Sequence, residues 1–318
     1  MRAVLAALIT SAVLASPAQA VVGGKPVPEG QFGYVANVRI MGAFGCTGTL
    51  IAPQWVLTAG HCGSATGSLS QGVVPSPVAW PPQAYEIVLG TVYADGHGGE
   101  THSVSQVLVD SDYILPNGSG NDVTLMKLDQ PTQIAPMKIA AVGERSSWLP
   151  GKLQTIAGFG ASSKDGSEMP DQMQYAQVPI TTDDHCANAY GDGSFDAKTM
   201  VCAGYADGGT DTCEGDSGGP LLAPVRTGFR LAGATSFGDG CAEAGKPGVY
   251  ARLAEGPIRE WLKSVVPEGF APEPAAPKPK AKKKKRATRR CSRRRAHAHA
   301  RDRRARGSCR RTRRTHSS

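Results

Sequence analysis

The sequence has 318 residues, eight cysteines and a formal net charge of +8. From residue 21 to 270 there are 14 Lys and Arg against 25 Asp and Glu, whereas from residue 271 to 318 there are 20 against 2. An acidic body therefore carries a very basic end, which excludes treating the whole chain as a basic protein. The length suits one large all-β domain or two small ones.

Residues 1–20 predict a secretory signal peptide. Arg2 precedes a mostly apolar run from Ala3 to Ala15, and small residues then lead to Ala20. The run is short for a membrane span, and no stop-transfer segment follows it. We therefore expect a secreted, extracellular protein whose mature chain begins at Val21.

Six cysteines lie in the body and two lie in the basic end. Even numbers in an exported chain favour disulfides over catalytic thiols. Their spacing does not fit a zinc site, because no CxxC motif occurs and the adjacent pair His61-Cys62 is not a ligand cluster. The sequence alone leaves the connectivity of these cysteines open.

From Phe32 to about Tyr250, short apolar and β-branched segments alternate with Gly, Pro, Asn and Asp clusters. This pattern predicts an all-β sandwich or barrel. The clearest strand segments are 34–40, 55–59, 85–90, 102–109, 122–128, 153–158, 173–180 and 229–236. The stretch from Gly63 to Pro82, rich in Gly, Ser and Pro, predicts a surface loop.

The body ends in a predicted amphipathic helix over residues 257–266. Pro257 suits a first helical turn, and the apolar residues recur at helical spacing. They are Ile258, Trp261, Leu262 and Val265. We expect this stripe to pack on the body, and we assign it no function.

Residues 268–318 predict a disordered tail rich in Pro, Lys and Arg. Two interpretations stay open: a solvated charged segment, or an anchor for anionic cell-surface polymers or nucleic acid that salt would release. No aromatic residue follows Phe270, so recognition by base stacking is not expected.

Three motifs carry the chemistry: LTAGHC at 57–62, NDVTLMKL at 121–128 and DTCEGDSGGP at 211–220. Each of them alone has an ordinary structural explanation, as a strand end, a turn or a glycine-rich loop. Together they present His61, Asp122 and Ser217 in that order. A serine hydroxyl becomes a good nucleophile when a neighbouring base removes its proton.

With VVGG at 21–24, CAGY at 202–205 and KPGVYARL at 246–253, these motifs resemble the trypsin/chymotrypsin-like serine peptidases over nearly the whole body. The resemblance implies a peptidase domain over residues 21–267. Its fold would be two six-stranded antiparallel β-barrels with the active site between them, plus a C-terminal helix. No cofactor and no metal are expected.

The resemblance also implies the roles of the site residues. Ser217 would be the nucleophile, His61 the base that later acts as acid, and Asp122 the group that orients the imidazole. The backbone N–H groups of Gly215 and Ser217 would form the oxyanion hole. These roles together would hydrolyse a peptide bond through an acyl-enzyme on Ser217.

Asp211, six residues before Ser217, matches the floor of the primary specificity pocket in trypsin-like members of the family. A carboxylate at the base of a narrow pocket favours Arg or Lys as its partner. The other expected substrate-binding residues are Thr212, Ser236, Gly238 and Gly248. We therefore expect a serine endopeptidase that cleaves polypeptides after Arg or Lys.

The resemblance further implies three disulfides, whereas the two cysteines of the tail, Cys291 and Cys309, have no family counterpart. The implied pairs are Cys46–Cys62, Cys186–Cys202 and Cys213–Cys241.

In this family a newly made N-terminal amine folds inward and pairs with the Asp before the nucleophile. Here that pair would be Val21 and Asp216. Relatives usually guard the event with a propeptide ending in Arg or Lys, but here Ala20 precedes Val21. Our hypothesis is that removal of the signal peptide itself creates the activating amine.

Some positions depart from the family pattern. Phe159 and Phe237 stand where many relatives have Trp, and Gly60 replaces a common Ala, changes to which we give little weight. Thr91 stands where calcium-binding relatives have a carboxylate. With that ligand missing, calcium dependence is not expected.

An alternative of a different class is a secreted pseudopeptidase that acts as a binding protein. Such relatives have usually lost His, Asp or Ser, and this sequence keeps all three. We also expect a monomer, and a tail that the enzyme trims at a site between Phe270 and Lys280. The NGS triplet at 117–119 matches a glycosylation acceptor. The physiological substrate cannot be derived from the sequence.

Overall fold

The computed structural model describes residues 21–64, 78–113, 120–191 and 193–273. The predicted signal peptide, most of the predicted 63–82 loop, the NGS triplet and the tail from residue 274, with Cys291 and Cys309, lie outside the described residues. Within the described ranges, no helix combines the length and the apolar character needed to cross a membrane.

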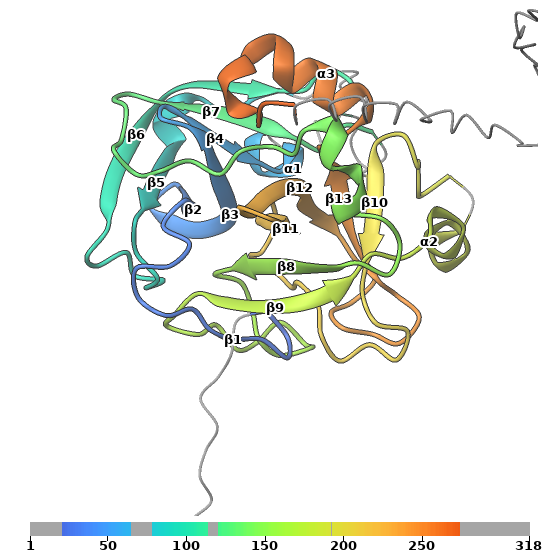
Figure 1. Cartoon of the computed structure of the whole chain (residues 1–318). Coiled ribbons are helices and arrows are strands. Elements are labelled where there is room, and N and C mark those ends of the chain that lie inside the picture. Colours follow the sequence, from blue (N-terminus) through green and yellow to red (C-terminus); the bar gives the residue numbers. More distant parts are fainter. Residues whose placement is uncertain (1–20, 65–77, 114–119, 192, 274–318) are drawn as a thin grey trace, which may run out of the picture. The chain divides into compact units, whose positions relative to one another are not determined.

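The first half of the body is a closed barrel of antiparallel strands in the order β2-β3-β4-β7-β6-β5 (Figure 1). The strands are β2 (Val35–Ile40), β3 (Ala43–Ala52), β4 (Trp55–Thr58), β5 (Tyr85–Leu89), β6 (Glu100–Val109) and β7 (Thr124–Leu128). Inward-facing side chains such as Leu50, Ile87 and Met126 are fully buried and fill the interior.

The second half is a sheet in the order β1-β9-β8-β11-β12-β13-β10. The strands are β1 (Lys25–Pro26), β8 (Leu153–Gly158), β9 (Gln174–Pro179), β10 (Met200–Ala203), β11 (Pro220–Val225), β12 (Gly228–Phe237) and β13 (Gly248–Arg252). A bridge between Ile180 and Ala203 joins the end of β9 to β10. The six strands other than β1 therefore curve round until the first meets the last. The short β1 adds a seventh strand at β9. The predicted fold class is confirmed.

The helices are short and lie between or after the strands. They are α1 (Gly60–Gly63), η1 (Pro82–Ala84), η2 (Val142–Ser147), α2 (Asp183–Tyr190), α3 (Gly256–Val265) and η3 (Pro267–Gly269). Helix α3 confirms the predicted C-terminal helix. Its Ile258 and Leu262 are fully buried in a cluster that also contains Leu57 from β4 and Leu231 from β12. The helix therefore packs on a core that draws on both halves of the body.

The packed body continues past the boundary that we predicted at residue 267. After η3, Phe270 forms a parallel bridge with Ile139. The Glu273 carboxylate then accepts hydrogen bonds from the N–H groups of Val142 and Gly143 at 3.0 and 2.9 Å. The first residues of the predicted tail, as far as Glu273, are thus folded onto the body.

Candidate active site

Strand β4 and helix α1 bring His61 to the edge of a cavity. The strand is buried from Val56 onward, and His61 follows two residues after Ala59 with 31% of its side chain exposed. A Cβ atom on the preceding Gly60 would lie 2.9 Å from Asp122 Oδ1. Glycine at position 60 therefore allows the His61 and Asp122 segments to approach closely, a role to which we gave little weight from the sequence.

His61 and Asp122 form a hydrogen-bonded pair. Asp122 lies two residues before β7 and is 3% exposed. Its Oδ2 lies 3.0 Å from His61 Nδ1, and its Oδ1 accepts the His61 backbone N–H at 3.0 Å. The Ser236 hydroxyl donates to Oδ2 from the second half of the body. Three donors thus hold the carboxylate in one orientation.

This pairing changes the charge balance of both groups. Burial acts to lower the pKa of His61, but the charge and hydrogen bond of Asp122 outweigh burial and raise it. Burial acts to raise the pKa of Asp122, but its contacts with His61 and Ser236 hold it below the usual value. The arrangement therefore supports an ionised carboxylate that stabilises a protonated imidazole.

Ser217 lies in the same cavity as His61 and Asp122, a space of about 370 Å³. The Ser217 carbonyl accepts the Thr47 N–H at 2.9 Å, which anchors the serine to β3. Within the described residues, no hydrogen bond joins the Ser217 hydroxyl to His61. Hydrogen bonds between a nucleophile and its base are often long before substrate binds, so this geometry is compatible with a nucleophile and a base.

The backbone donors of the turn around Ser217 differ in their partners. The N–H groups of Asp216, Gly218 and Gly219 donate to the carbonyls of Cys213, Thr235 and Asp216. In contrast, those of Gly215 and Ser217 have no acceptor among the described residues. Gly215 has a φ of +92°, a conformation that glycine adopts readily. Free donors of this kind can stabilise a developing oxyanion.

Asp211 lies in the wall of the same cavity and is 3% exposed. Its Oδ1 accepts the Thr212 N–H at 2.8 Å, and its Oδ2 accepts the Ala242 N–H at 3.3 Å. No cation pairs with it among the described residues, and burial raises its pKa to about 7. A Cβ on Gly248 would lie 2.5 Å from Asp211 Oδ1, so glycine at position 248 leaves room at the carboxylate.

The remaining expected substrate-binding residues, Thr212, Ser236 and Gly238, line the cavity as well. The Thr212 hydroxyl lies 3.5 Å from both Asp211 Oδ1 and the Tyr250 hydroxyl. We predicted Ser236 only as a substrate-binding residue, but its hydroxyl also donates a hydrogen bond to Asp122. It therefore connects the pocket wall to the His61–Asp122 pair.

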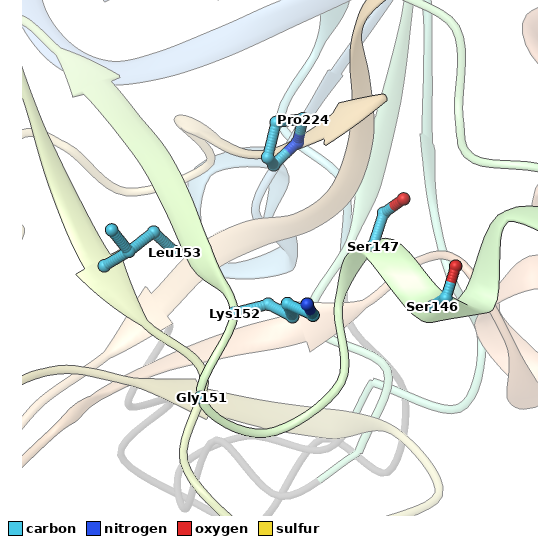
Figure 2. A pocket seen from close by; sticks show the side chains of 6 residues that line it. All are labelled: Ser146, Ser147, Gly151, Lys152, Leu153 and Pro224. Atoms are coloured by element: carbon cyan, nitrogen blue, oxygen red, sulfur yellow. The ribbon is translucent and has the colours of Figure 1, made fainter. Parts of the chain in front are cut away.

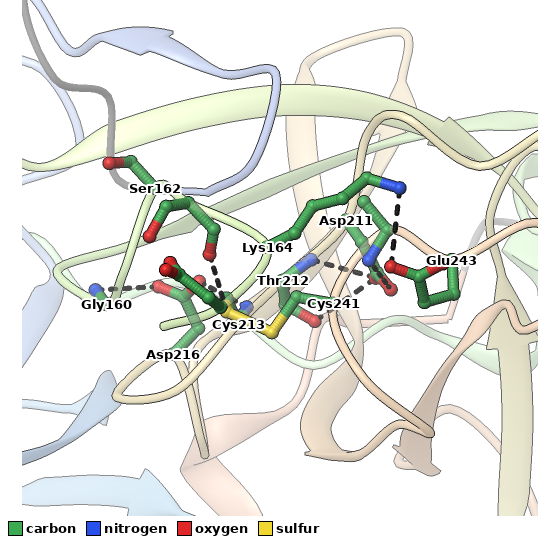
Figure 3. The surroundings of a disulfide bond; sticks show 12 residues. Gly160, Ser162, Lys164, Asp211, Thr212, Cys213, Asp216, Cys241 and Glu243 are labelled. Atoms are coloured by element: carbon green, nitrogen blue, oxygen red, sulfur yellow. Dashed lines mark hydrogen bonds and ion pairs between the residues drawn. A yellow bond between two sulfur atoms is a disulfide. The ribbon is translucent and has the colours of Figure 1, made fainter. Parts of the chain in front are cut away.

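Disulfides join the loops of the site. Figure 3 shows the Cys213–Cys241 disulfide between the Asp216 carboxylate and the Asp211–Thr212 contact. Near it, Lys164 and Glu243 form an ion pair at 3.4 Å. The structure contains the disulfides Cys46–Cys62, Cys186–Cys202 and Cys213–Cys241.

Asp216 is a second buried carboxylate without a cationic partner among the described residues. It is fully buried and accepts the N–H groups of Gly160 and Cys213, each at 2.9 Å. Burial raises its pKa to about 7. Val21 is also fully buried, and Val22 forms an antiparallel bridge with Asp211. The VVGG segment thus already lies against the loop that carries Asp211 and Asp216.

A second cavity of about 430 Å³ lies elsewhere on the body (Figure 2). Its lining residues are Ser146, Ser147, Gly151, Lys152, Leu153 and Pro224. It offers no imidazole or carboxylate, and within the described residues no hydrogen bond joins Lys152 to either serine. The cavity at His61 contains a serine, a histidine and a buried aspartate, so it is the candidate active site.

One group of metal-ligating residue types lies close together in the described ranges: Cys46, His61 and Cys62. Both cysteines are joined in a disulfide, which removes the thiolates that a metal would need. In the loop after β5, the Thr91 hydroxyl donates to the His97 carbonyl at 2.7 Å. Where calcium-binding relatives have a carboxylate, this chain therefore has a hydroxyl that already bonds within the loop.

Thr47 and Tyr113 are parts of the site that sequence reasoning missed. The Thr47 hydroxyl donates to the Gly215 carbonyl at 2.9 Å, and the backbone N–H of Thr47 donates to Ser217. Tyr113 lines the cavity beside Gly60. Neither residue lies in one of the three motifs, so only their proximity to the site in the fold identifies them.

Comparison with known proteins agrees with this geometry. The family model described as Trypsin matches residues 21–262. A trypsin from Saccharopolyspora erythraea is 37% identical over 219 residues, which cover 69% of this chain and 86% of that protein. Serine protease 56 from Mus musculus is 34% identical over 78% of this chain, and serine proteinase stubble from Drosophila melanogaster is 34% identical over 76%.

The two animal proteins are much longer than the matched region, which covers 39% and 31% of them. The bacterial trypsin, in contrast, is matched over most of its length. The family model covers the residues from Val21 into helix α3, including all three motifs of the site. The chain belongs to the trypsin family, and the protein is a serine endopeptidase.

Proposed function

We propose that the protein cleaves peptide bonds that follow Arg or Lys. The observation that carries this proposal is Asp211, a buried carboxylate in the wall of the active-site cavity with no cation among the described residues. Burying an unpaired charge is costly. A guanidinium or ammonium group from a substrate would pair with Asp211 and offset that cost.

In the proposed mechanism, His61 removes the proton of the Ser217 hydroxyl as its oxygen attacks the carbonyl carbon of the substrate. The carbonyl oxygen becomes negative and accepts hydrogen bonds from the N–H groups of Gly215 and Ser217. His61 then protonates the leaving amine, and the C–N bond breaks to give the acyl-enzyme. Water then attacks the acyl-enzyme while His61 takes its proton, and His61 returns a proton to Ser217 as the bond between Ser217 and the acyl group breaks and the carboxylic acid is released. Asp122 stabilises the charged imidazole in both halves of the reaction.

A cleavage-site profile on a mixed peptide library tests the proposal. We expect cuts after Arg and Lys by the wild-type protein and no cuts by Ser217→Ala. Cleavage after large apolar or small residues would contradict the assigned specificity. Equal activity of the two proteins would contradict the assigned nucleophile.

We also propose that the Val21 amine and the Asp216 carboxylate form an activating ion pair. The support is that Val21 is buried, Val22 pairs with Asp211, and Asp216 has two backbone donors but no cation among the described residues. Ala20 precedes Val21, so removal of the signal peptide would produce this amine directly. N-terminal sequencing of the secreted protein should start at Val21, and any other start contradicts the proposal.

The remaining assignments follow from the sequence and the packed body. We infer an exported monomer with a signal peptide at 1–20 and a peptidase domain from residue 21. We also propose that the basic tail begins beyond Glu273, and the support is that residues 268–273 contact the body. A salt wash of producing cells tests whether the tail retains the enzyme on anionic surface polymers. The alternative of a catalytically inactive binding protein has no support, because His61, Asp122 and Ser217 share one cavity.

A further inference from the structure

Asp110 is a buried carboxylate that the proposed mechanism does not use. It follows the last residue of β6 and is 2% exposed. Its Oδ2 accepts a hydrogen bond from Asn121 Nδ2 at 2.9 Å, and Asn121 is itself 4% exposed. Since Asn121 directly precedes Asp122, this bond ties the end of β6 to the neighbour of the residue that faces His61.

The backbone of Asp110 makes a second connection on the other side of Asp122. Its N–H donates to the Val123 carbonyl at 3.1 Å. Asp110 thus holds both chain neighbours of Asp122, Asn121 through its side chain and Val123 through its backbone. We refer to these two contacts as the Asp110 clamp.

Asp110 makes a third contact, through its carbonyl, with a residue of the cavity wall. The Asp110 carbonyl accepts the Tyr113 N–H at 3.0 Å, and Tyr113 forms a bridge with Gly120. Tyr113 lies in the cavity wall, next to Gly60. The same turn therefore places one wall of the cavity and the segment that carries Asp122.

The hydrogen bond between Asp110 and Asn121 is costly to break because both side chains are buried. The other Asp110 oxygen accepts the Asp112 N–H at 3.0 Å. Burial and the nearby charge of Asp112 raise the pKa of Asp110, and its hydrogen bonds counteract them only in part. If the Asp110 carboxylate were removed, the Asn121 amide would be left buried without its acceptor, a state that proteins avoid.

We propose that Asp110 is a positioning residue for catalysis: by holding Asn121 and Val123, it fixes the orientation of Asp122 toward His61. This inference rests on the proposed function, because it assumes that Asp122 orients the catalytic imidazole. Asp110 touches neither the cavity nor the proposed reacting atoms. Its effect would pass through the peptide segment 121–123.

The test uses Asp110→Ala, Asn121→Ala and the double variant in the full-length protein, with a small arginine ester as substrate. Each single change should lower kcat by about 10- to 100-fold, because a misplacement of about 1 Å in a catalytic group has effects of this size. KM should stay near the wild-type value, since the Asp211 pocket lies on other elements. The kcat of the double variant should be no lower than that of the less active single variant, because both changes break the same hydrogen bond.

Two further variants separate positioning from general stability. Asp110→Asn keeps the shape and one acceptor oxygen, so it should recover a large part of kcat. The exposed neighbour Asp112 supplies the matched control: Asp112→Ala keeps the backbone donor and should change kcat by less than about twofold. All rates are measured below the melting temperature of the least stable variant.

The clamp is refuted if Asp110→Ala and Asn121→Ala are folded and turn over the ester at the wild-type kcat. Losses that multiply in the double variant, or that appear in KM alone, would overturn it as well. Wild-type and Ser217→Ala proteins are assayed first on the same ester. Failure of the proposed function appears in that comparison, whereas failure of the clamp appears only in the Asp110 and Asn121 variants.

Discussion

Two buried carboxylates line the cavity from opposite halves of the body, and they differ in their partners. Asp122, beside the first barrel, contacts His61 and Ser236, and its pKa lies below the usual value. Asp211, in the second half, meets neutral donors, and its pKa is raised to about 7. Within the described part of the chain, Asp122 has an imidazole partner, whereas Asp211 has no cationic partner. Under the proposed function, the His61–Asp122 pair is preorganised, and a substrate cation completes the pocket at Asp211.

A change at Asp122 should have the largest effect on activity. In Asp122→Asn the side chain keeps its shape but can no longer stabilise a charged His61 as an anion does. We expect kcat to fall about 10⁴-fold, as it does for the same change in a serine peptidase with this arrangement of Ser, His and Asp. Steady-state kinetics on an arginine ester would measure it. A fall in affinity without a fall in kcat would contradict the assigned role.

Removing the pocket charge should have the next largest effect. Asp211→Ser leaves a cationic side chain without its partner, and breaking a buried pair costs about 3–5 kcal/mol. The kcat/KM for an arginine ester should fall by about 10²- to 10⁴-fold. The kcat/KM for an uncharged ester is the control and should change far less. A similar loss on both esters would show that Asp211 does not set the specificity.

Blocking the amine partner of Asp216 should reduce activity on the order of 100-fold. The matched proteins begin at Val21 or carry one extra residue before it. Without an ammonium group, the pKa of Asp216 is about 7 in the fold, against about 4 in the unfolded chain.

The folded carboxyl of the extended form therefore keeps its proton to higher pH than the unfolded one. The extended protein should lose stability as the pH rises from about 4 to 7. Chemical denaturation of both forms across this range checks the prediction. The form that starts at Val21 should show a smaller loss, and equal losses would exclude the ion pair.

The smallest expected effect is the pH dependence of substrate binding. As the pH falls through 7, the empty Asp211 carboxyl takes up a proton and attracts a cation less well. KM for an arginine ester should rise about tenfold from pH 7 to pH 6 at most. The kcat should fall separately as His61 becomes protonated. In Asp211→Ser the change in KM should disappear while the change in kcat remains.

Much of the fold was predictable from local patterns. All eight strand segments that we predicted contain a strand, and helix α3 differs from its prediction by one residue at each end. The packed body extends beyond residue 267, where we had predicted its end. Phe270 pairs with Ile139, and Glu273 accepts hydrogen bonds from Val142 and Gly143. Arg259 is buried although it is charged, because the Ala140 carbonyl accepts its hydrogen bond at 2.6 Å. Contacts between distant segments leave no periodic trace in a sequence.

The amino-acid order already carried the chemical groups of this protein: a histidine, an aspartate and a serine in three short motifs, an aspartate at position 211 and six cysteines in the body. Residue identity sets what a group can donate, accept or ionise. The packed fold adds that Asp211 and Asp216 are buried with no cationic partner among the residues that the structure describes, that Gly60 leaves room for Asp122, and that Asp110 holds the neighbours of Asp122. Burial and distance arise when remote segments pack together, and they determine which charges are stabilised.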